Sequence, residues 1–283
     1  MTTIALFGAG GKMGCRITDN LKGDGEYRLL YIETSEAGLG RLRERGLSAT
    51  PYDEAARAAE VVVLAVPDAL IGKVASSQVT PFLESGAMVI CLDPAAPVAG
   101  VLPQRRDITY FVTHPCHPPV FSDETDPEAR RDFFGGVRAK QNIVCALVQG
   151  PEQDYARGEV IARRMFAPVM KAHRITVEQM AILEPALSET VAATLLTVIR
   201  EAMDEAVRRG VPYEAARDFL LGHIRINLGM FFGEIDTPLS DGAKLAVAQA
   251  KTRLLQPDWK TVFEPEAIRA SINAITGAES GQA

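Results

Sequence analysis

The sequence predicts an α/β Rossmann-type domain with a doubly wound parallel sheet, followed by an all-helical C-terminal domain. In the first half of the chain, short apolar runs alternate with polar helical stretches, and a glycine-rich segment directly follows the first run. After about Thr176 almost no strand pattern occurs. We therefore expect a dinucleotide-binding domain over residues 1–175 and a helical substrate or dimerisation domain over residues 176–283.

Six apolar runs are expected to form the strands. The run Val61–Val66 lacks polar alternation, which is typical of a parallel strand that is buried on both faces. The other five runs are Ile4–Phe7, Tyr27–Ile32, Met88–Leu92, Thr109–Val112 and Ile143–Val148. Met13, Ile17 and Leu21 recur at four-residue spacing and predict a helix after the first run, and Asp53 is expected to cap a later one.

Helical patterns fill the second half of the chain. The first covers Glu178–Arg209, where Pro185 either kinks one long helix or joins two helices. Further helices are expected from Pro212 to about Phe232, over Pro238–Leu255 and over Glu264–Ile275, and the tail over 277–283 is expected to fray.

Composition excludes several classes of protein. The 283 residues are 47% hydrophobic, which excludes a disordered chain, and 30 basic against 36 acidic residues give a net charge of −6. A nucleic-acid-binding protein usually has a basic excess. We see no apolar run near the roughly 18 residues of a membrane span and no basic start typical of a signal peptide. The four widely spaced cysteines (15, 91, 116 and 145) indicate reduced thiols, so we expect a cytoplasmic protein.

The segment GAGGKMG between the first strand and the first helix is the candidate phosphate-binding loop. Glycine permits a tight turn and a close approach of the backbone to a pyrophosphate, and a helix N-terminus offers free N–H groups. Because Met13 occupies the usual place of the third glycine, the spacing is GxxGxxG or GxGxxxG. The expected cofactor-binding residues here are Gly8, Gly10, Gly11, Lys12, Met13 and Gly14.

Glu33 ends the second strand and indicates which cofactor is bound. It lies 33 − 14 = 19 residues after Gly14, close to the expected spacing of about 20. A carboxylate there accepts hydrogen bonds from the adenosine ribose and repels a 2′-phosphate, which favours NAD over NADP. Arg41 and Arg43 could serve such a phosphate, although the outer face of a helix is the favoured interpretation for both.

Two strand ends also point to the ligand edge of the sheet. Val66 and Pro67 follow one strand and are expected to line the site of the nicotinamide ribose. Asp68 and Asp93 lie at equivalent strand ends, where a role in the site and a role in loop formation are equally favoured.

His114 and His117 are the expected catalytic histidines. They occur in THPCHPPVF, directly after a predicted strand and on the same edge as the glycine loop, with prolines that stiffen the segment. The alternative is a turn with two exposed imidazoles. His173 is expected to be structural or exposed, and His223 to be a core histidine.

Glu184 is the expected catalytic carboxylate. The helix Met180–Ile199 is almost free of charge, so it is expected to be buried all round, and a buried carboxylate must be paired, protonated or bound to metal. Glu189 lies five residues further, about 140° around the helix, and is not expected to share a partner with Glu184. The alternative for Glu184 is a structural ion pair with an arginine such as Arg225.

Five segments together carry a resemblance to a known family: GAGGKMG, AVPD, LDPAAP, THPCHP and LEPALSET. The chain resembles the NAD-binding proteins related to phosphogluconate dehydrogenase, and among them most closely the D-apionate oxidoisomerases of bacterial sugar-acid catabolism. The resemblance covers Ile4 to about Ile275. It implies NAD-linked oxidation of a secondary alcohol in a branched polyhydroxy acid, a skeletal rearrangement to a 3-oxo acid, and a homodimer through the helical domains.

One departure from related enzymes suggests a metal. The β-hydroxyacid dehydrogenases of this architecture carry a KxxxN pattern on the interdomain helix, but residues 178–199 contain no lysine. We therefore expect His114 and Glu184 to hold a divalent metal, zinc or another transition ion, which would lower the pKa of the alcohol and polarise the ketone. His117 is expected to matter less than His114 unless it is a third ligand or the proton carrier.

Two other functions compete with this one. The first is a simple NAD(P)-dependent 3-hydroxyacid dehydrogenase without rearrangement, which product analysis would distinguish. The second is an NAD-sensing binding protein with no turnover, which NADH production with any sugar acid would eliminate.

Overall fold

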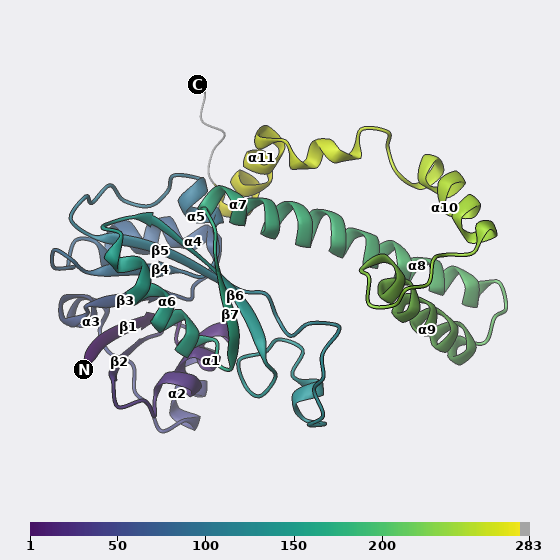
Figure 1. Ribbon diagram of the computed structural model, residues 1–283. Coiled ribbons are helices and arrows are strands. Elements are labelled where there is room, and N and C mark those ends of the chain that lie inside the picture. Colours follow the sequence, from purple (N-terminus) through teal and green to yellow (C-terminus); the bar gives the residue numbers. More distant parts are fainter. Residues whose placement is uncertain (278–283) are drawn as a thin grey trace. The chain divides into compact units, whose positions relative to one another are not determined.

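The computed structural model describes residues 1–277, so the predicted frayed tail lies outside the described residues except for Gly277. Seven strands form one sheet in the order β2-β1-β3-β4-β5-β6-β7 (Figure 1). The strands are β1 (Thr2–Phe7), β2 (Tyr27–Ile32), β3 (Val61–Leu64), β4 (Met88–Cys91), β5 (Thr109–Pro115), β6 (Gln141–Gln149) and β7 (Val169–Arg174). The predicted Rossmann-type α/β fold is confirmed.

The sheet is mostly parallel but not entirely so. Strands β1 to β5 pair in parallel, whereas β6 runs antiparallel to β5 and β7 runs parallel to β6. The sequence did not reveal β7, because this edge strand exposes residues such as Met170 and Lys171 and has no continuous apolar run. A difference at β5 matters more for the site: the strand continues past Val112 to Pro115, so His114 lies within it.

Helices cover both faces of the sheet. Alternate residues of β1 face opposite layers, with Ala5 and Phe7 in one core cluster and Ile4 and Leu6 in the other. All four residues of β3 are buried, as the unbroken valine run predicted. One face carries α3 (Tyr52–Ala58), α4 (Asp68–Val74), η1 (Ala75–Val79), α5 (Ala95–Val98) and α7 (Val177–Ala181). The other carries α1 (Lys12–Leu21), α2 (Glu36–Glu44) and α6 (Gln153–Met165).

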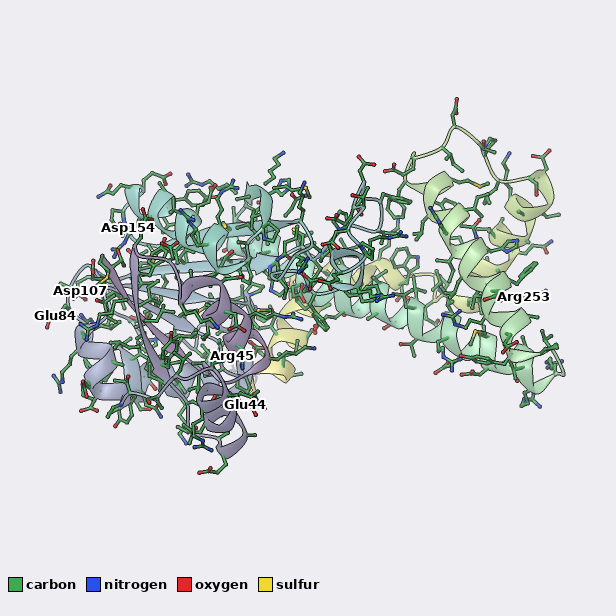
Figure 2. The ribbon with its side chains drawn as sticks, turned by 90° about the horizontal axis from the view of Figure 1, so that it is seen from below. Glu44, Arg45, Glu84, Asp107, Asp154 and Arg253 are labelled. Carbon is green, nitrogen blue, oxygen red and sulfur yellow. The ribbon has the colours of Figure 1, made fainter. Side chains whose placement is uncertain are left out.

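Charged side chains lie on the outside of this domain (Figure 2). Glu84 and Asp107 are exposed, and Arg105 donates hydrogen bonds to the Asp107 carboxylate, which holds the pKa of that carboxyl well below its usual range.

The α3 helix begins after Pro51, which is its N-cap, and Asp53 lies in its first turn and makes no capping hydrogen bond. The prediction that Asp53 caps this helix is therefore wrong.

By its contacts the chain divides into two units, at a place other than the predicted boundary after residue 175. One unit contains Met1–Glu184 and the C-terminal segment from Ile268, and the other contains Pro185–Ala267. The first turns of α7 stay with the sheet because Met180 is buried in one of its core clusters. Thr176 and Gln179 form a capping box that starts this helix.

The helix that Pro185 was expected to interrupt is continuous over Val177–Arg208. It comprises α7, a π-helical stretch η3 (Ile182–Ala193) and α8 (Thr194–Arg208). Proline has no N–H to donate, and the wider stretch changes the hydrogen-bond register there without ending the helix. The Thr190 hydroxyl donates to the Pro185 carbonyl oxygen at 2.6 Å.

The remaining helices are α9 (Tyr213–Phe231), α10 (Asp241–Leu254), the short η4 (Trp259–Phe263) and α11 (Pro265–Thr276), with η2 (Ala129–Arg131) in the loop between β5 and β6. Two of them begin shortly after the predicted prolines 212 and 238, and α11 begins one residue after the predicted Glu264. Pro212 is the N-cap of α9, and Ser240 caps α10 by accepting a hydrogen bond from the backbone N–H of Ala243.

The helix Val177–Arg208 corrects two predictions. No segment long and apolar enough to span a membrane was expected from the sequence. This helix is long and apolar enough by length and composition alone, with a mean hydropathy of 1.5 in its most apolar window. It was also expected to be buried all round, yet only 11% of that window is buried and Leu187, Leu195 and Leu196 are exposed.

Candidate functional site

The glycine loop is built so that three of its positions accept only glycine. Gly8 has a φ of +74°, and its N–H donates to the Ile32 carbonyl oxygen at 2.9 Å. A Cβ on Gly14 would lie 2.0 Å from the Gly8 carbonyl oxygen, and one on Gly10 would lie 2.4 Å from the carbonyl oxygen of Gly38 in α2. The loop is therefore packed tightly between β1, α1 and α2.

Gly11 differs because it opens α1 and faces less protein. It is the N-cap residue and provides no side-chain cap, so the first N–H groups of α1 have no intrahelical partner. A Cβ on Gly11 would approach the Gly8 carbonyl oxygen at 3.0 Å, which is tight but less so than at the neighbouring glycines. Free N–H groups and the helix dipole make this end of α1 suitable for an anion.

Glu33 joins the end of β2 to the glycine loop. One carboxylate oxygen accepts a hydrogen bond from the Gly10 N–H at 3.0 Å, and the other accepts from the N–H groups of Thr34 and Ser35 and from the Ser35 hydroxyl. Burial raises the pKa of Glu33, but the donors of Ser35, Thr34 and Gly10 outweigh it and lower the pKa. Glu33 is thus held as an anion beside the loop.

Arg41 also contacts the loop, whereas the sequence favoured the outer face of a helix. Its Nε donates to the Gly10 carbonyl oxygen at 2.5 Å. Both polar groups of the Gly10 peptide unit are therefore fixed by charged side chains, the N–H by Glu33 and the carbonyl by Arg41. The guanidinium brings a positive charge close to the carboxylate that was expected to reject NADP.

We expect Glu33→Gln to narrow the preference for NAD over NADP by roughly one to two decades in kcat/KM. The neutral amide removes the repulsion against a 2′-phosphate, while Arg41 supplies a partner for it. Steady-state kinetics with both cofactors measure the change, and Glu36→Gln at an exposed position of α2 is the matched control. A wild-type enzyme equally efficient with NADP would contradict the role of Glu33.

The carboxyl ends of β1 and β3 form the switch point of the sheet. From β1 the chain continues to β2 on one side, and from β3 it continues to β4 on the other side. Val66 packs against a core cluster there, with its Cγ1 3.2 Å from where a Cβ on Gly8 would lie. Pro67 is exposed and is the N-cap of α4. Val66 thus lies next to the glycine loop, and Pro67 follows it at the start of α4. The contact of both residues with a nicotinamide ribose stays a prediction.

The structure brings His114 and Glu184 together. His114 Nε2 lies 3.4 Å from Glu184 Oε2, with 22% and 23% of the two side chains exposed. On its other side, His114 Nδ1 lies 2.8 Å from the carbonyl oxygen of Leu92. A carbonyl oxygen only accepts, so Nδ1 carries a proton and donates it. A neutral His114 therefore presents the Nε2 lone pair toward Glu184.

Two further carboxyls, Asp68 and Asp93, interact electrostatically with this pair. Burial raises the pKa of Asp93 to about 6, against the hydrogen bond that its Oδ1 accepts from the Ala95 N–H at 2.7 Å, and the charges of Asp68 and Glu184 also raise it. Burial likewise raises the pKa of Asp68, which His114 counteracts. Of the two interpretations left open by the sequence, these couplings favour membership of the site.

We expect Asp93→Asn to stabilise the protein at pH 8 by on the order of 1–3 kcal/mol and to have little effect below about pH 3. The folded-state pKa of Asp93, about 6, lies above its ordinary value of 3.8, so the folded protein holds the extra proton between these values. Stability is therefore lost as the pH rises through this window, and asparagine removes that loss. Thermal unfolding of both proteins across pH tests this, and equal midpoints at pH 8 would contradict it.

His117 lies close to His114 but has different contacts. Their ring centroids are 6.2 Å apart, and His117 Nδ1 lies 2.9 Å from the carbonyl oxygen of Phe134. His117 has a φ of +61°, so the backbone turns sharply after β5. In the unit Pro185–Ala267, His223 is exposed and stacked on Phe219, so the prediction of a core histidine is wrong.

Comparisons with known proteins identify the family. The chain is 58% identical over 277 residues to a D-apionate oxidoisomerase from Rhizobium rhizogenes, with 98% of this chain and 100% of the relative covered. It is 56% identical over 274 residues to a D-apionate oxidoisomerase from Cupriavidus necator, with 96% and 99% covered.

The chain belongs to the D-apionate oxidoisomerase family.

The resemblance predicted from the sequence is thereby confirmed. Family models agree with its two parts: residues 1–118 match the NADPH-binding domain of acetohydroxy acid isomeroreductase, and residues 122–276 match the C-terminal part of decarboxylating phosphogluconate dehydrogenase. A crystal structure of a semialdehyde dehydrogenase NAD-binding protein from Cupriavidus necator, in complex with calcium and NAD, is 55% identical. It matches with a TM-score of 0.94 and covers 98% of this chain and 100% of that one.

The metal expected at His114 and Glu184 lacks a complete set of protein ligands. Within residues 1–277, no group of three or more His, Cys, Asp or Glu side chains is arranged to hold an ion. Catalytic zinc sites usually have three protein ligands, and this pair supplies two donors. A transition-metal ion held by His114 and Glu184 therefore stays a proposal.

Sequence reasoning missed two residues of the site region in this oxidoisomerase homologue, Phe134 and Arg16. Phe134 lies in the long loop between β5 and β6, and the Arg16 guanidinium carbon lies 4.6 Å from the centroid of its ring. The only signal was the aromatic pair before Gly135 and Gly136 in an otherwise polar stretch. Nothing in the sequence pattern places that loop next to α1.

Proposed function

We propose that this chain uses NAD to oxidise D-apionate, or a branched sugar acid of the same class, and rearranges its carbon skeleton to a 3-oxo acid. The observation that carries the proposal is the His114–Glu184 pair at the carboxyl end of β5, on the edge of the sheet where β1 leads into the glycine loop. The names of the relatives and the NAD complex of a 55% identical protein support it.

His114 has the geometry of a general base. Nδ1 is fixed as a donor to the Leu92 carbonyl oxygen, so the lone pair of a neutral imidazole is at Nε2. When the substrate alcohol is oxidised, Nε2 accepts the hydroxyl proton, and the Glu184 carboxylate stabilises the imidazolium that results. The bound NAD supplies the acceptor for the hydride.

Rearrangement requires a proton at the new carbonyl oxygen and a base for the neighbouring hydroxyl. The His114 imidazolium holds the proton taken in the first step and can return it to the ketone oxygen while a substituent migrates to that carbon. Asp93, with a pKa of about 6, is a second group that exchanges a proton near neutral pH. Both steps are thus served by side chains at the ends of β4 and β5.

A panel of hydroxy acids tests the activity itself. NADH absorbance is followed with D-apionate and with unbranched 3-hydroxy acids, each with NAD and with NADP. The proposal predicts the highest kcat/KM for D-apionate with NAD. Preference for an unbranched 3-hydroxy acid would support the simple dehydrogenase, and no turnover with any acid would support the NAD-sensing protein.

The divalent ion expected from the sequence stays a separate proposal. His114 Nε2 and Glu184 Oε2 would be its two protein donors, and water and the oxygens of the substrate would have to complete its coordination. The proton steps above need no ion. Elemental analysis and activity after exhaustive chelation separate the two cases, and restoration by a divalent ion would support the ion.

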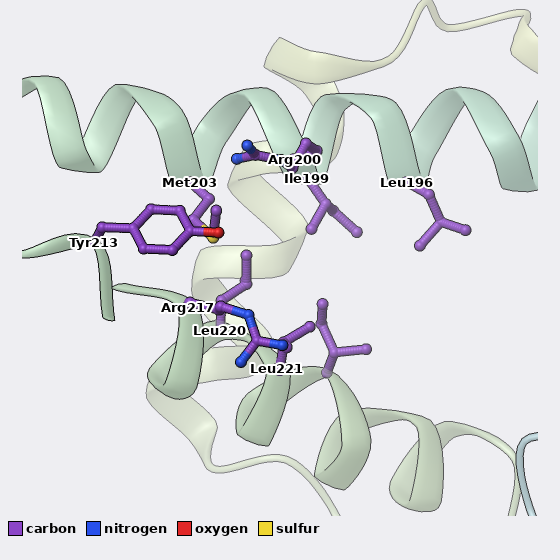
Figure 3. A pocket seen from close by; sticks show the side chains of 9 residues that line it. Leu196, Ile199, Arg200, Met203, Tyr213, Arg217, Leu220 and Leu221 are labelled. Carbon is purple, nitrogen blue, oxygen red and sulfur yellow. The ribbon is translucent and has the colours of Figure 1, made fainter. Parts of the chain in front are cut away.

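We also propose a homodimer formed through the helical domain. In the unit Pro185–Ala267, large apolar side chains are exposed on each of α8, α9 and α10, including Leu196 at 57%, Phe219 at 69% and Leu245 at 60%. Between α8 and α9 lies an open groove of about 240 Å³, with Leu196, Met203 and Leu221 in its lining (Figure 3). Apolar surface of this extent is typical of an interface, and a second copy is the proposed partner.

We expect Leu196→Glu to convert the dimer to a monomer, because it puts a charge into a dry interface. Light scattering after size-exclusion chromatography measures the mass, with Leu70→Glu on α4, where the leucine is 47% exposed, as the matched control. A wild-type monomer at micromolar concentration would contradict the proposal.

A cytoplasmic location is the companion proposal. The cysteines are free, and Cys15, Cys91 and Cys145 are buried, as reduced thiols in a core would be. Burial of the long apolar helix against a second copy would explain its composition without a membrane.

A further inference from the structure

Two cations on α1 share one aromatic ring. Lys12 Nζ lies 3.6 Å from the centroid of the Phe134 ring, and the Arg16 guanidinium carbon lies 4.6 Å from it. Lys12 and Arg16 are four residues apart, so they lie on the same face of α1. Each is close enough for a cation–π interaction, which restrains both side chains next to the first turn of the helix.

Neither cation has a carboxylate partner. Other arginines of the sheet domain form ion pairs, as Arg45 does with Asp19 at 3.0 Å. Within residues 1–277, by contrast, no carboxylate oxygen lies within ion-pair distance of Lys12 or Arg16. The N-terminal end of α1 adds a partial positive charge. The local charge is therefore positive and uncompensated, which favours an anion.

The loop that carries Phe134 is held in a defined place. Asp132 Oδ2 accepts hydrogen bonds from the N–H groups of Arg138 and Ala139 at 2.9 and 3.1 Å, which closes the loop on itself. Asn20 of α1 donates to the Gly136 carbonyl oxygen at 3.0 Å, which ties the loop to the same helix as the two cations. The position of the ring against α1 is thus part of the folded structure.

The same ring connects the cations to the proposed base. The Phe134 and His117 ring centroids are 5.9 Å apart, and those of His117 and His114 are 6.2 Å apart. These contacts link Lys12 and Arg16 through Phe134 and His117 to His114.

We propose that Lys12 and Arg16, positioned by Phe134, bind the carboxylate of the substrate. The inference rests on the proposed function, because it assumes a sugar acid whose alcohol is at His114. Arg16 provides a planar donor group that suits a carboxylate, and Lys12 a point charge. Lys12 thereby changes from the cofactor-binding role expected from the sequence to a role in substrate specificity.

The competing anion is the cofactor pyrophosphate, which would use the same cations. The test is calorimetry of wild type, Lys12→Met, Arg16→Met and Phe134→Leu, with NAD alone and then with D-apionate added to the NADH complex, which has no hydride acceptor. Lys22→Met at the other end of α1, where Lys22 pairs with Asp19, is the control. Binding is read without turnover, and KM values are measured in parallel.

The inference predicts that Lys12→Met and Arg16→Met each weaken D-apionate binding roughly 10- to 100-fold, and that Phe134→Leu weakens it less. In all three variants the NAD Kd stays within about threefold of wild type. Weaker NAD binding with an unchanged affinity for D-apionate would overturn it and assign the cations to the pyrophosphate. Unchanged affinity for both ligands would also overturn it. If the wild-type enzyme with NAD turns over no D-apionate, the proposed function itself fails, and that outcome is distinct from either of these.

Discussion

His114→Gln is expected to lower kcat roughly 10²- to 10⁴-fold while the NAD Kd stays within about twofold of wild type. Glutamine keeps a donor near the Leu92 carbonyl oxygen but has no basic nitrogen to accept the alcohol proton. His114 lies at the end of β5, where it contacts Leu92, Glu184 and His117, so the affinity for the cofactor pyrophosphate at the glycine loop should not change. Stopped-flow absorbance of NADH measures the chemical step.

Two variants separate catalysis from structure in this experiment. Glu184→Gln should lower kcat less than His114→Gln, because it removes only the stabilisation of the imidazolium at Nε2. His173→Gln on the edge strand β7 is the matched control, because it makes the same replacement at a histidine outside the proposed machinery. A His114→Gln enzyme with more than a tenth of the wild-type kcat would refute the assignment of the base.

Gly11→Val is expected to weaken NAD binding at least roughly 100-fold with the fold intact. A branched side chain at the N-cap of α1 occupies the space in front of the free N–H groups, where the pyrophosphate is expected. Its Cβ would meet the Gly8 carbonyl oxygen at 3.0 Å, so a small local shift is also expected.

Calorimetric titration with NAD measures the affinity, and circular dichroism checks the fold. The control is the same replacement at Gly23, where a Cβ would meet no atom within 4 Å. If Gly11→Val binds NAD as tightly as the Gly23→Val control, the glycine loop is not the pyrophosphate site.

Local patterns predicted the sheet wherever a strand is buried on both faces. The valine run of β3 and the glycines after β1 have unmistakable sequence signatures, because burial and tight turns each restrict residue type. The exposed edge strand β7 has no such restriction, and the antiparallel direction of β6 depends on pairing across the chain. The exposure of Leu195 and Leu196 could not be predicted either, since an apolar helix looks the same whether its own chain or a partner covers it.

The site was predictable only in its parts. Glu33, His114 and Glu184 were each recognised from position or from charge in an apolar context, and the structure brings the last two to 3.4 Å. The raised pKa of Asp93 depends on neighbours that are distant in the sequence. The same holds for the Phe134 contacts with Lys12 and Arg16, which depend on the course of a loop that no local pattern specifies.

The most direct test of the central claim is the identity of the product made from D-apionate. Isotope-labelled D-apionate is incubated with the enzyme and excess NAD, and carbon NMR of the product is combined with NADH absorbance. Oxidation followed by rearrangement predicts one NADH for each molecule of a 3-oxo acid whose labelled carbon has moved to a new neighbour. An unrearranged keto acid formed with one NADH would contradict the isomerase step, and a product formed without NADH would contradict the oxidation.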